Sequence, residues 1–264
     1  MTDLLAVENL SFQVNDGKTW LKKSSSFELG PINFNIQAGE TLAIVGANSS
    51  GKSLLAKLLV GLERPDSGAI YLNGQKLHQY NLKQRCLNIR MIFQNSNESL
   101  NPGLTLGAIL EEPLILNTDL NQHQRISKIE QTLQQVGLLT DHRFYYRHML
   151  SDGQRQRVAL ARALILNPQI IVADEPFAAL DPSVRSQMVN LLMKLQLELG
   201  LGFIFISHNL GIVRHISDKI LVMQKGKVIE SGKTDVIFTW PKHEYTKKLV
   251  AAHQALLTRQ STSA

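Results

Sequence analysis

Short apolar runs recur along the 264 residues, and segments with helical periodicity lie between several of them. These runs predict strands over 41–45, 69–72, 89–93, 170–173, 203–206 and 220–223, with Asn73-Gly74 as a hairpin turn. Helices are expected over 51–60 and 182–199, where Asp181 can cap the second helix and Pro182 can occupy its first position. Strands that alternate with helices indicate an α/β fold with a mostly parallel sheet.

The middle of the chain has a different pattern. Residues 95–167 show helical patterns throughout, with a Gln-rich face over 121–136. We therefore expect an inserted α-helical subdomain, and two polar segments, 15–26 and 258–264, are expected to be loose. The chain is expected to form a single domain. We divide it into 1–94 and 168–232 for an α/β core with an antiparallel β region, 95–167 for the helical subdomain, and 233–264 for a C-terminal helical extension and tail.

Charge and composition narrow the function classes. The net charge is +6, and +5 of this excess lies from Lys219 onward, where eight Lys/Arg oppose three Asp/Glu. This distribution is typical of a solvated tail or docking surface, and we expect no nucleic-acid partner.

The lone Cys86 cannot form a disulfide within the chain, which fits a reducing compartment. We find neither a signal peptide in Met1–Leu10 nor an apolar run of the ~18 residues that a membrane span needs, so a membrane role is expected to come through a partner.

The strongest local motif is a glycine-rich run between a predicted strand and a predicted helix. Its residues match G-x-x-x-x-G-K-[ST] and are Gly46, Ala47, Asn48, Ser49, Ser50, Gly51, Lys52 and Ser53. Glycines in such a P-loop let backbone N–H groups close around phosphate oxygens, and the following helix adds the positive end of its dipole. We expect Lys52 to contact the β- and γ-phosphates of a nucleotide and Ser53 to bind Mg²⁺.

A second motif is an apolar strand that runs directly into two acids. Residues 170–173 are all apolar, and Asp174 and Glu175 follow them. Ligands of such sheets bind at the carboxyl ends of the strands, where both carboxylates are expected. Asp174 suits Mg²⁺ coordination, and Glu175 suits the orientation or deprotonation of an attacking water. Together the two motifs predict a P-loop NTPase.

A third motif indicates the class of NTPase. It reads Leu150-Ser151-Asp152-Gly153-Gln154, and with the helical run that follows it resembles the L-S-G-G-Q signature of ABC-type ATPases. Gln94 then resembles the Q-loop of that family, Asp181 its D-loop and His208 its switch histidine. Each of these three residues alone would be an ordinary polar or structural residue. Their order and spacing over nearly the whole chain favour the ABC family.

The resemblance implies ATP hydrolysis between two subunits. Ser53, Gln94 and Asp174 are then the Mg²⁺ ligands, and Glu175, His208 and Gln94 are the catalytic residues. A second subunit's ATP site is completed by the signature residues Ser151, Asp152, Gly153 and Gln154. Phosphoryl transfer needs positioning and charge neutralisation, which these residue types supply.

Further segments are similar to ATPases of oligopeptide and dipeptide importers. Residues 94–102 are similar to the Q-D-P-x-x-S-L-N-P run of that subfamily and 243–249 to its H-P-Y-T-K-x-L segment, whereas 116–120 and 145–150 resemble the Sap-type peptide-transport ATPases. This implies transport of peptides, with antimicrobial peptides, haem or polyamines as other cargo and with the direction of transport open.

The resemblance also implies partners. They are two integral-membrane permease subunits, a second ABC ATPase that is more often a different protein than a second copy and, indirectly, a substrate-binding protein. The location that it implies is the cytoplasmic face of the bacterial inner membrane. Some relatives carry a cysteine cluster for iron–sulfur, and since Cys86 stands alone we expect no such cluster.

Three departures from the family pattern bear on the site. Asp152 stands where the signature usually has glycine, and Ala178 where the D-loop commonly has serine. The aromatic residue that stacks on adenine in the family aligns with Val14, and Phe12 and Trp20 remain alternatives.

One alternative function comes from another class, a soluble ABC ATPase that acts on ribosomes or DNA. Members of that class carry two cassettes or a long coiled coil, and this chain has one cassette and no long heptad array. A small-molecule kinase or a GTPase is disfavoured, because no N-K-x-D motif is present and the signature segment would be unexplained.

Overall fold

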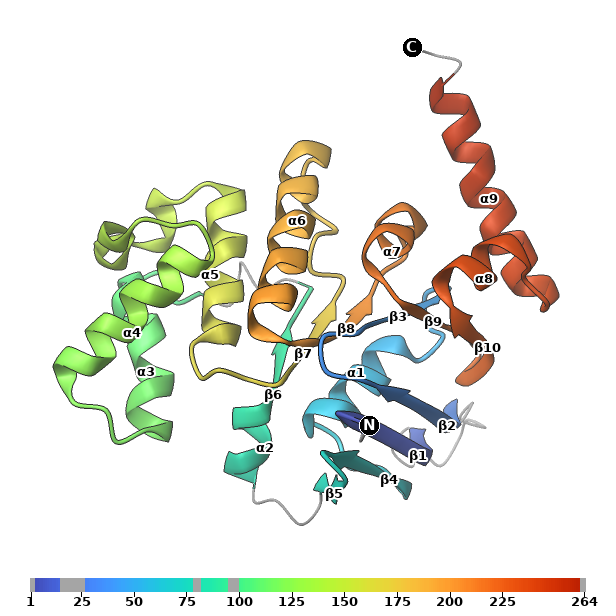
Figure 1. Cartoon of the computed structure of the whole chain (residues 1–264), viewed down its shortest axis with the longest axis horizontal. Helices are drawn as coiled ribbons and strands as arrows, with labels where there is room; N and C mark the ends of the chain where they lie inside the picture. The colour runs from blue at the N-terminus through green and yellow to red at the C-terminus, as the bar shows by residue number, and fades with distance from the viewer. Residues whose placement is uncertain (1–2, 15–26, 78–81, 95–99, 262–264) are drawn as a thin grey trace, which may run out of the picture. The chain divides into compact units, whose positions relative to one another are not determined.

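The computed structural model of the chain describes residues 3–14, 27–77, 82–94 and 100–261 (Figure 1). The chain divides into two compact units, of which unit 1 comprises Met1–Gln79 and Ile204–Ala264 and unit 2 comprises Tyr80–Phe203. Strand β8 (Gly202–Ile206) contributes residues to both units. Among the described residues, no helix is long and apolar enough to cross a membrane.

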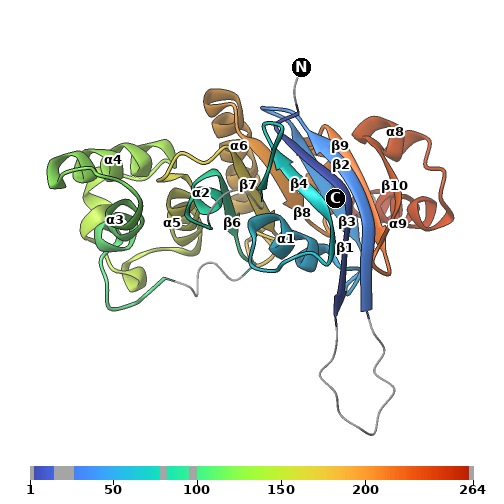
Figure 2. The same ribbon diagram turned by 90° about the horizontal axis from the view of Figure 1, so that it is seen from below.

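Unit 1 contains a four-stranded antiparallel sheet. Its strands are β1 (Leu5–Val14), β2 (Phe27–Ile36), β4 (Ser67–Leu72) and β5 (Gln75–Lys76), in the order β2-β1-β4-β5. Figure 2 shows β1, β2 and β4 beside helix α1. The β4–β5 hairpin turns at Asn73 (φ 50°) and Gly74 (φ 76°), as the Asn-Gly pair predicts for a type I′ turn.

A second group of strands in unit 1 positions the glycine-rich loop. Strand β3 (Thr41–Gly46) lies between β8 and β9 (Lys219–Gln224), and β10 (Lys227–Lys233) forms the edge beyond β9. β3 and β9 are parallel, with Val45 opposite Val222, whereas β9 and β10 are antiparallel. Every residue of β3 is buried, and a continuous apolar run is typical of a parallel strand that is covered on both faces.

Helices cover both faces of β3 in unit 1. They are α1 (Lys52–Val60), α7 (Leu210–Ile216), α8 (Thr234–Thr239) and α9 (Glu244–Ser261). Figure 1 shows α1 between β3 and the antiparallel sheet, with α7 on the other side of β3. On the α7 side, Ala43 and Val45 of β3 pack with Val213, Phe238 and Val250 in one apolar cluster. The start of the C-terminal helix is therefore part of the core of unit 1.

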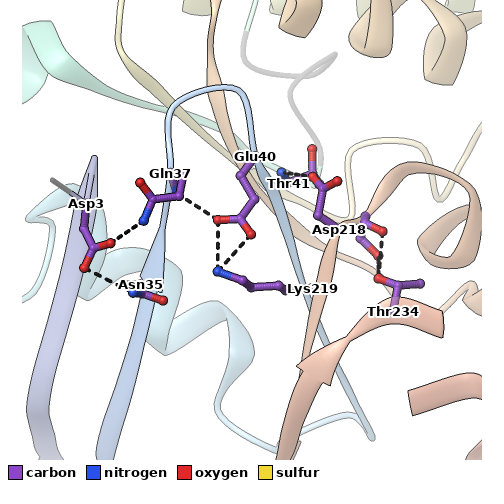
Figure 3. A network of polar contacts seen from close by, with 9 residues as sticks. Asp3, Asn35, Gln37, Glu40, Thr41, Asp218, Lys219 and Thr234 are labelled. Carbon is purple, nitrogen blue, oxygen red and sulfur yellow. Dashed lines mark hydrogen bonds and ion pairs between the residues drawn. The ribbon is translucent and has the colours of Figure 1, made fainter. Parts of the chain in front are cut away.

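A polar network holds the strands of unit 1 at the end of β3 that is remote from the loop (Figure 3). The Glu40 carboxylate pairs with the Lys219 ammonium at 2.9 Å and accepts a hydrogen bond from the Gln37 backbone N–H at 2.8 Å. The Asp218 carboxylate accepts one from the Thr41 N–H at 2.8 Å, and Asp3 accepts from Asn35 at 3.1 Å and from Gln37. These contacts fix where β3 begins relative to β2 and β9.

Unit 2 is mostly helical. Its elements are α2 (Leu82–Asn88), β6 (Ile89–Ile92), α3 (Leu106–Asn117), α4 (Gln122–Gln135), the 3₁₀ turns η2 (Thr140–Phe144) and η3 (Arg147–Met149), α5 (Asp152–Leu164), β7 (Ile170–Asp174) and α6 (Pro182–Leu199). Helices α3, α4 and α5 contact one another, and α5 also contacts β6 and α6. Strands β6 and β7 are parallel, with Ile92 opposite Ala173.

Two local expectations differ from the structure. Pro182 occupies the first turn of α6 and Asp181 precedes it, but the Asp181 side chain makes no capping hydrogen bond. The segment 258–264 was expected to be loose, yet α9 continues to Ser261, because residues 254–260 are mostly good helix formers. The other segment expected to be loose, 15–26, lies outside the described residues, as do 262–264.

Candidate nucleotide site

The glycine-rich loop of unit 1 connects the buried strand β3 to helix α1. Its backbone takes left-handed conformations at Ser49 (φ 62°) and Gly51 (φ 101°). A Cβ at Gly51 would lie 2.6 Å from Leu29 Cδ1, so position 51 combines a backbone that favours glycine with a close approach. No side chain caps the N-terminus of α1, and a helix N-terminus of this kind favours an anion.

Lys52 is held by its own loop. Its side chain is buried, and its ammonium group donates to the carbonyl oxygens of Gly46 and Ala47, both at 2.9 Å. Ser53 is exposed at the first turn of α1. The buried Ser50 hydroxyl has no hydrogen-bond partner among the described residues. The loop therefore presents an oriented cation, the N-terminus of a helix and a buried hydroxyl, a set that suits phosphate oxygens.

Two contacts from outside the loop fix its path, and a third joins β8 to β3 just before it. The Gly226 N–H, in the β9–β10 turn, donates to the Ser50 carbonyl at 3.0 Å. The Tyr245 hydroxyl, at the start of α9, accepts from the Ala47 N–H at 2.8 Å. In the same unit, the Ser207 N–H donates to the Ile44 carbonyl at 3.4 Å, which places the exposed His208 just beyond the end of β8, next to β3.

The acid pair lies at the end of β7 in unit 2. Asp174 ends this strand and is buried, and the half-buried Glu175 follows in a left-handed conformation (φ 45°). A non-glycine residue with such a φ is uncommon and marks a tight change of direction after the strand. Gln94 follows the parallel strand β6, so Gln94 and Asp174 lie after neighbouring strand ends.

The signature residues form the N-terminus of α5. Ser151 and Gln154 make a capping box, in which the Gln154 N–H donates to the Ser151 hydroxyl at 3.3 Å and the Gln154 side chain accepts from the Ser151 N–H at 3.0 Å. Asp152 lies in the first turn, is exposed and pairs with Arg155, a position where the helix dipole favours an acid. Gly153 follows, and the Val184 side chain of α6 lies beside it.

Helix α5 is also tied to the loop after the acid pair. The buried Gln156 side chain donates to the Pro176 carbonyl at 2.7 Å. Within unit 2 the structure thus connects the signature helix with the acid pair, and Asp181 precedes α6 in the same unit. Within unit 1 it brings together the loop, His208 and Tyr245. Sequence reasoning noted the segment around Tyr245 as a subfamily feature and missed its contact with the loop.

Comparison with known proteins decides the family. The model of the ABC transporter family matches residues 29–178, which are more than half of the chain. The chain belongs to the ABC transporter family.

Similar proteins agree with this assignment. The ABC ATPase is 46% identical over 250 residues to the putrescine export system ATP-binding protein SapF of Escherichia coli, covering 95% of this chain and 93% of that protein. It is 48% identical to the dipeptide transport ATP-binding protein DppF of Escherichia coli, covering 85% of this chain and 68% of that protein. The predicted likeness to peptide-importer ATPases of the Sap type is confirmed.

Solved structures match over almost the whole ABC ATPase. The cbiO1 protein from Clostridium perfringens, part of the ABC transporter complex cbiONQ, superposes with a TM-score of 0.78 at 29% identity, covering 91% of this chain and 92% of that one. A dimeric post-hydrolysis state of the ATP-binding cassette MJ0796 with ADP and Pi superposes with a TM-score of 0.75 at 30% identity, covering 87% of this chain and 98% of that one. The predicted P-loop NTPase fold of the ABC type is confirmed, and the chain is an ATP-binding ATPase of that family.

One aromatic ring of the described residues lies against the P-loop, and it belongs to none of the three positions considered from the sequence. Phe12 and Val14 both lie in β1, and Trp20 lies outside the described residues. Val14 pairs directly with Phe27 of β2. The Phe27 Cζ lies 3.1 Å from the position that a Cβ on Gly51 would take, so this ring lies against the P-loop of the ABC ATPase. Phe27 could not be predicted from the sequence, because no local pattern determines the strand register that pairs it with Val14.

Proposed function

We propose that this ABC ATPase powers a separate membrane permease that transports peptides. The observation that carries the proposal is the P-loop, in which Lys52 is fixed beside the uncapped N-terminus of α1. The relatives named for dipeptide, peptide and putrescine transport support peptides as cargo, with polyamines as the nearest alternative. Antimicrobial peptides and haem are further cargo classes compatible with the same ATPase.

Hydrolysis follows from charge neutralisation and positioning. Lys52 and the first amides of α1 offset the charge of the β- and γ-phosphates, and Glu175 orients and polarises the attacking water. His208 holds the γ-phosphate side, and Gln94 reports on the presence of this phosphate. The hydroxyl of Ser53, the amide oxygen of Gln94 and the carboxylate of Asp174 are hard oxygen donors of the kind that hold Mg²⁺, which when bound neutralises phosphate charge.

The ATP site is completed by a second ABC ATPase. Ser151 and Gly153 at the N-terminus of α5 face the nucleotide of the partner subunit, and the dimeric form of the MJ0796 cassette supports this arrangement. The ion pair between Asp152 and Arg155 offsets the acid that replaces the usual glycine, so that less negative charge faces the partner's phosphates. The partner is a different ABC ATPase rather than a second copy, in keeping with the peptide-importer likeness.

The permease docks on the helical part of unit 2, at the cytoplasmic face of the bacterial inner membrane. Segment 139–149 supports this, because it exposes large apolar side chains: Leu139 is 71% exposed, Phe144 59% and Met149 54%. Tyr145 and Tyr146 add two further partly exposed rings. Clusters of exposed apolar residues mark interaction surfaces, and a membrane permease is the partner that the family assignment favours.

Copurification from membranes tests the proposal. A tagged chain expressed with the products of neighbouring genes is expected to retain a permease in detergent, and the double variant Phe144→Ser, Met149→Ser to lose it. Leu197→Ser, which changes an equally apolar and 85% exposed residue of α6, is the matched control and is expected to retain the permease. Sedimentation of the chain with ribosomes, and no permease in the membrane fraction, would contradict the proposal and favour the soluble alternative.

A further inference from the structure

The C-terminal helix of unit 1 contacts the P-loop through one side chain. Tyr245, in the first turn of α9, accepts a hydrogen bond at 2.8 Å from the backbone N–H of Ala47, 198 residues earlier in the chain. This is the one hydrogen bond that the structure gives the Tyr245 hydroxyl within the described residues. The contact lies wholly inside unit 1.

The bond to Ala47 acts on the same peptide group that holds Lys52. The N–H of Ala47 and the carbonyl of Gly46 belong to one planar peptide unit, which rotates as a body. Tyr245 holds the N–H side of this unit, and the Lys52 ammonium donates to its carbonyl side at 2.9 Å. A rotation of the peptide unit would break both contacts, so the phenol oxygen fixes the direction of the carbonyl that orients Lys52.

The Tyr245 ring is itself held in place by packing. It lies against the apolar cluster of unit 1 that contains Val45 of β3 and Val222 of β9. Thr246 is fully buried and Val250 is 5% exposed, so the first turns of α9 are anchored in the core. The phenol oxygen is thus a fixed acceptor and not the end of a mobile surface side chain.

A carboxylate secures the start of α9. Glu230 of β10 accepts hydrogen bonds from the backbone N–H groups of Lys242 at 2.8 Å and His243 at 3.0 Å. Burial alone would raise the pKa of Glu230, but the hydrogen bonds that its carboxylate accepts from these two amides outweigh burial and lower it. The Tyr245 N–H donates to Nδ1 of His243 at 3.1 Å, which further defines the backbone at this turn.

We infer that Tyr245 is a positioning residue of the ATP site, which orients the Gly46–Ala47 peptide and through it the ammonium group of Lys52. The C-terminal extension thereby becomes part of the nucleotide-binding machinery. The inference rests on the proposed use of Lys52 as a phosphate ligand.

The variant Tyr245→Phe tests the inference, because it keeps the ring and removes only the hydroxyl. With the full-length protein and ATP as the titrant, we expect the dissociation constant to rise about two- to tenfold, the range for one lost neutral hydrogen bond. The KM for ATP should rise more than kcat falls. Tyr71→Phe is the matched control, since Tyr71 is a half-buried tyrosine of the same unit whose hydroxyl makes no hydrogen bond to the described residues.

Two measurements separate a positioning role from a structural one. Without nucleotide, Tyr245→Phe is expected to melt no more than a few degrees below Tyr71→Phe, the cost of about one hydrogen bond. The Ala47 amide is expected to exchange its hydrogen slowly in the wild type and faster in Tyr245→Phe. Equal ATP affinity in Tyr245→Phe and wild type, or a fast-exchanging Ala47 amide in the wild type, overturns the inference. A wild-type protein that binds no ATP instead overturns the proposed function.

Discussion

Lys52 illustrates how a buried charge is prepared for a ligand. Its ammonium group has two loop carbonyls as partners at 2.9 Å, and burial keeps water from competing for it. Carbonyl oxygens carry only partial charges, so they leave the net charge of the lysine available to a phosphate. The same loop provides the amides at the N-terminus of α1.

Replacement of Lys52 by alanine is expected to weaken ATP binding by about 10- to 100-fold, because a hydrogen bond to a charged group contributes about 1.5–3 kcal/mol. Isothermal titration of the purified protein measures this change. Lys57→Ala removes an exposed lysine from the same helix and is expected to leave the affinity within about twofold. If both variants lost ATP affinity to a similar extent, the effect would come from the removal of any positive charge on helix α1 and not from the position of Lys52.

Glu230 predicts a pH-dependent contribution to stability. Its pKa is lower in the folded protein than the ordinary value of 4.5, so the unfolded chain binds its proton more readily. The contribution is therefore complete above the pKa of the unfolded state and is lost as the pH falls through the folded pKa. Urea unfolding of wild type and Glu230→Gln is expected to show wild type as the more stable protein at about pH 7, with the difference shrinking below pH 4.5. A difference that is constant with pH would contradict this assignment.

At the scale of elements, two hairpin turns with the same backbone conformation have different surroundings. Gly74 joins β4 to β5 at φ +76°, and a Cβ there would meet no atom within 4 Å. Gly226 joins β9 to β10 at φ +80°, and a Cβ there would lie 1.9 Å from the Glu28 carbonyl oxygen. The second turn also donates to the Ser50 carbonyl and accepts from the Gly30 N–H, so it links β2, β9 and the P-loop.

The two glycines form a matched pair of substitutions. Gly74→Ala is expected to cost about 1 kcal/mol, the strain of a left-handed alanine. Gly226→Ala is expected to cost more than about 2 kcal/mol, because a backbone oxygen must also move. Denaturant unfolding gives both values, and ATP titration is expected to show weaker binding for Gly226→Ala alone. If Gly226→Ala and Gly74→Ala lost equal stability, the backbone around the β9–β10 turn would be able to move away from the added Cβ at no cost in free energy.

The sequence predicted those helices, strands and loops that local residue patterns determine. The P-loop between β3 and α1 follows from eight consecutive residues, and α6 follows from its apolar spacing and from Pro182. Contacts between distant segments were not predictable in the same way. The pairing of Val14 with Phe27 depends on the register across residues 15–26, and the contact of Tyr245 with Ala47 depends on how α9 packs against unit 1. No periodicity encodes either pair.

At the scale of the whole molecule, the proposed function assigns the signature helix and the P-loop to different nucleotides. The N-terminus of α5 belongs to unit 2, and the P-loop belongs to unit 1. A chain that lends its signature to a partner depends on that partner to complete its own site. In this proposed arrangement, ATP stabilises the assembly by mass action, and its hydrolysis releases the subunits.

Glu175→Gln tests this arrangement in solution. The variant keeps the size of the side chain and removes the carboxylate that we propose polarises water, so ATP should bind and persist. With the partner ATPase supplied, light scattering is expected to show a trapped two-subunit assembly in ATP and separate subunits in ADP. The double variant Lys52→Ala, Glu175→Gln is expected to stay separate in both nucleotides. If Glu175→Gln hydrolysed ATP at the wild-type rate, another group would have to activate the water.

The anchoring of α9 has a practical consequence for recombinant work on this protein. Because Thr246 is fully buried and Val250 is 5% exposed, a shortened gene product must retain the chain through at least residue 250 to preserve the fold of unit 1. Purification handles belong after Ser261, where α9 has ended. A truncation before Tyr245 would remove the acceptor for the Ala47 amide together with this anchor, so weak nucleotide binding by such a fragment would not by itself show a catalytic defect.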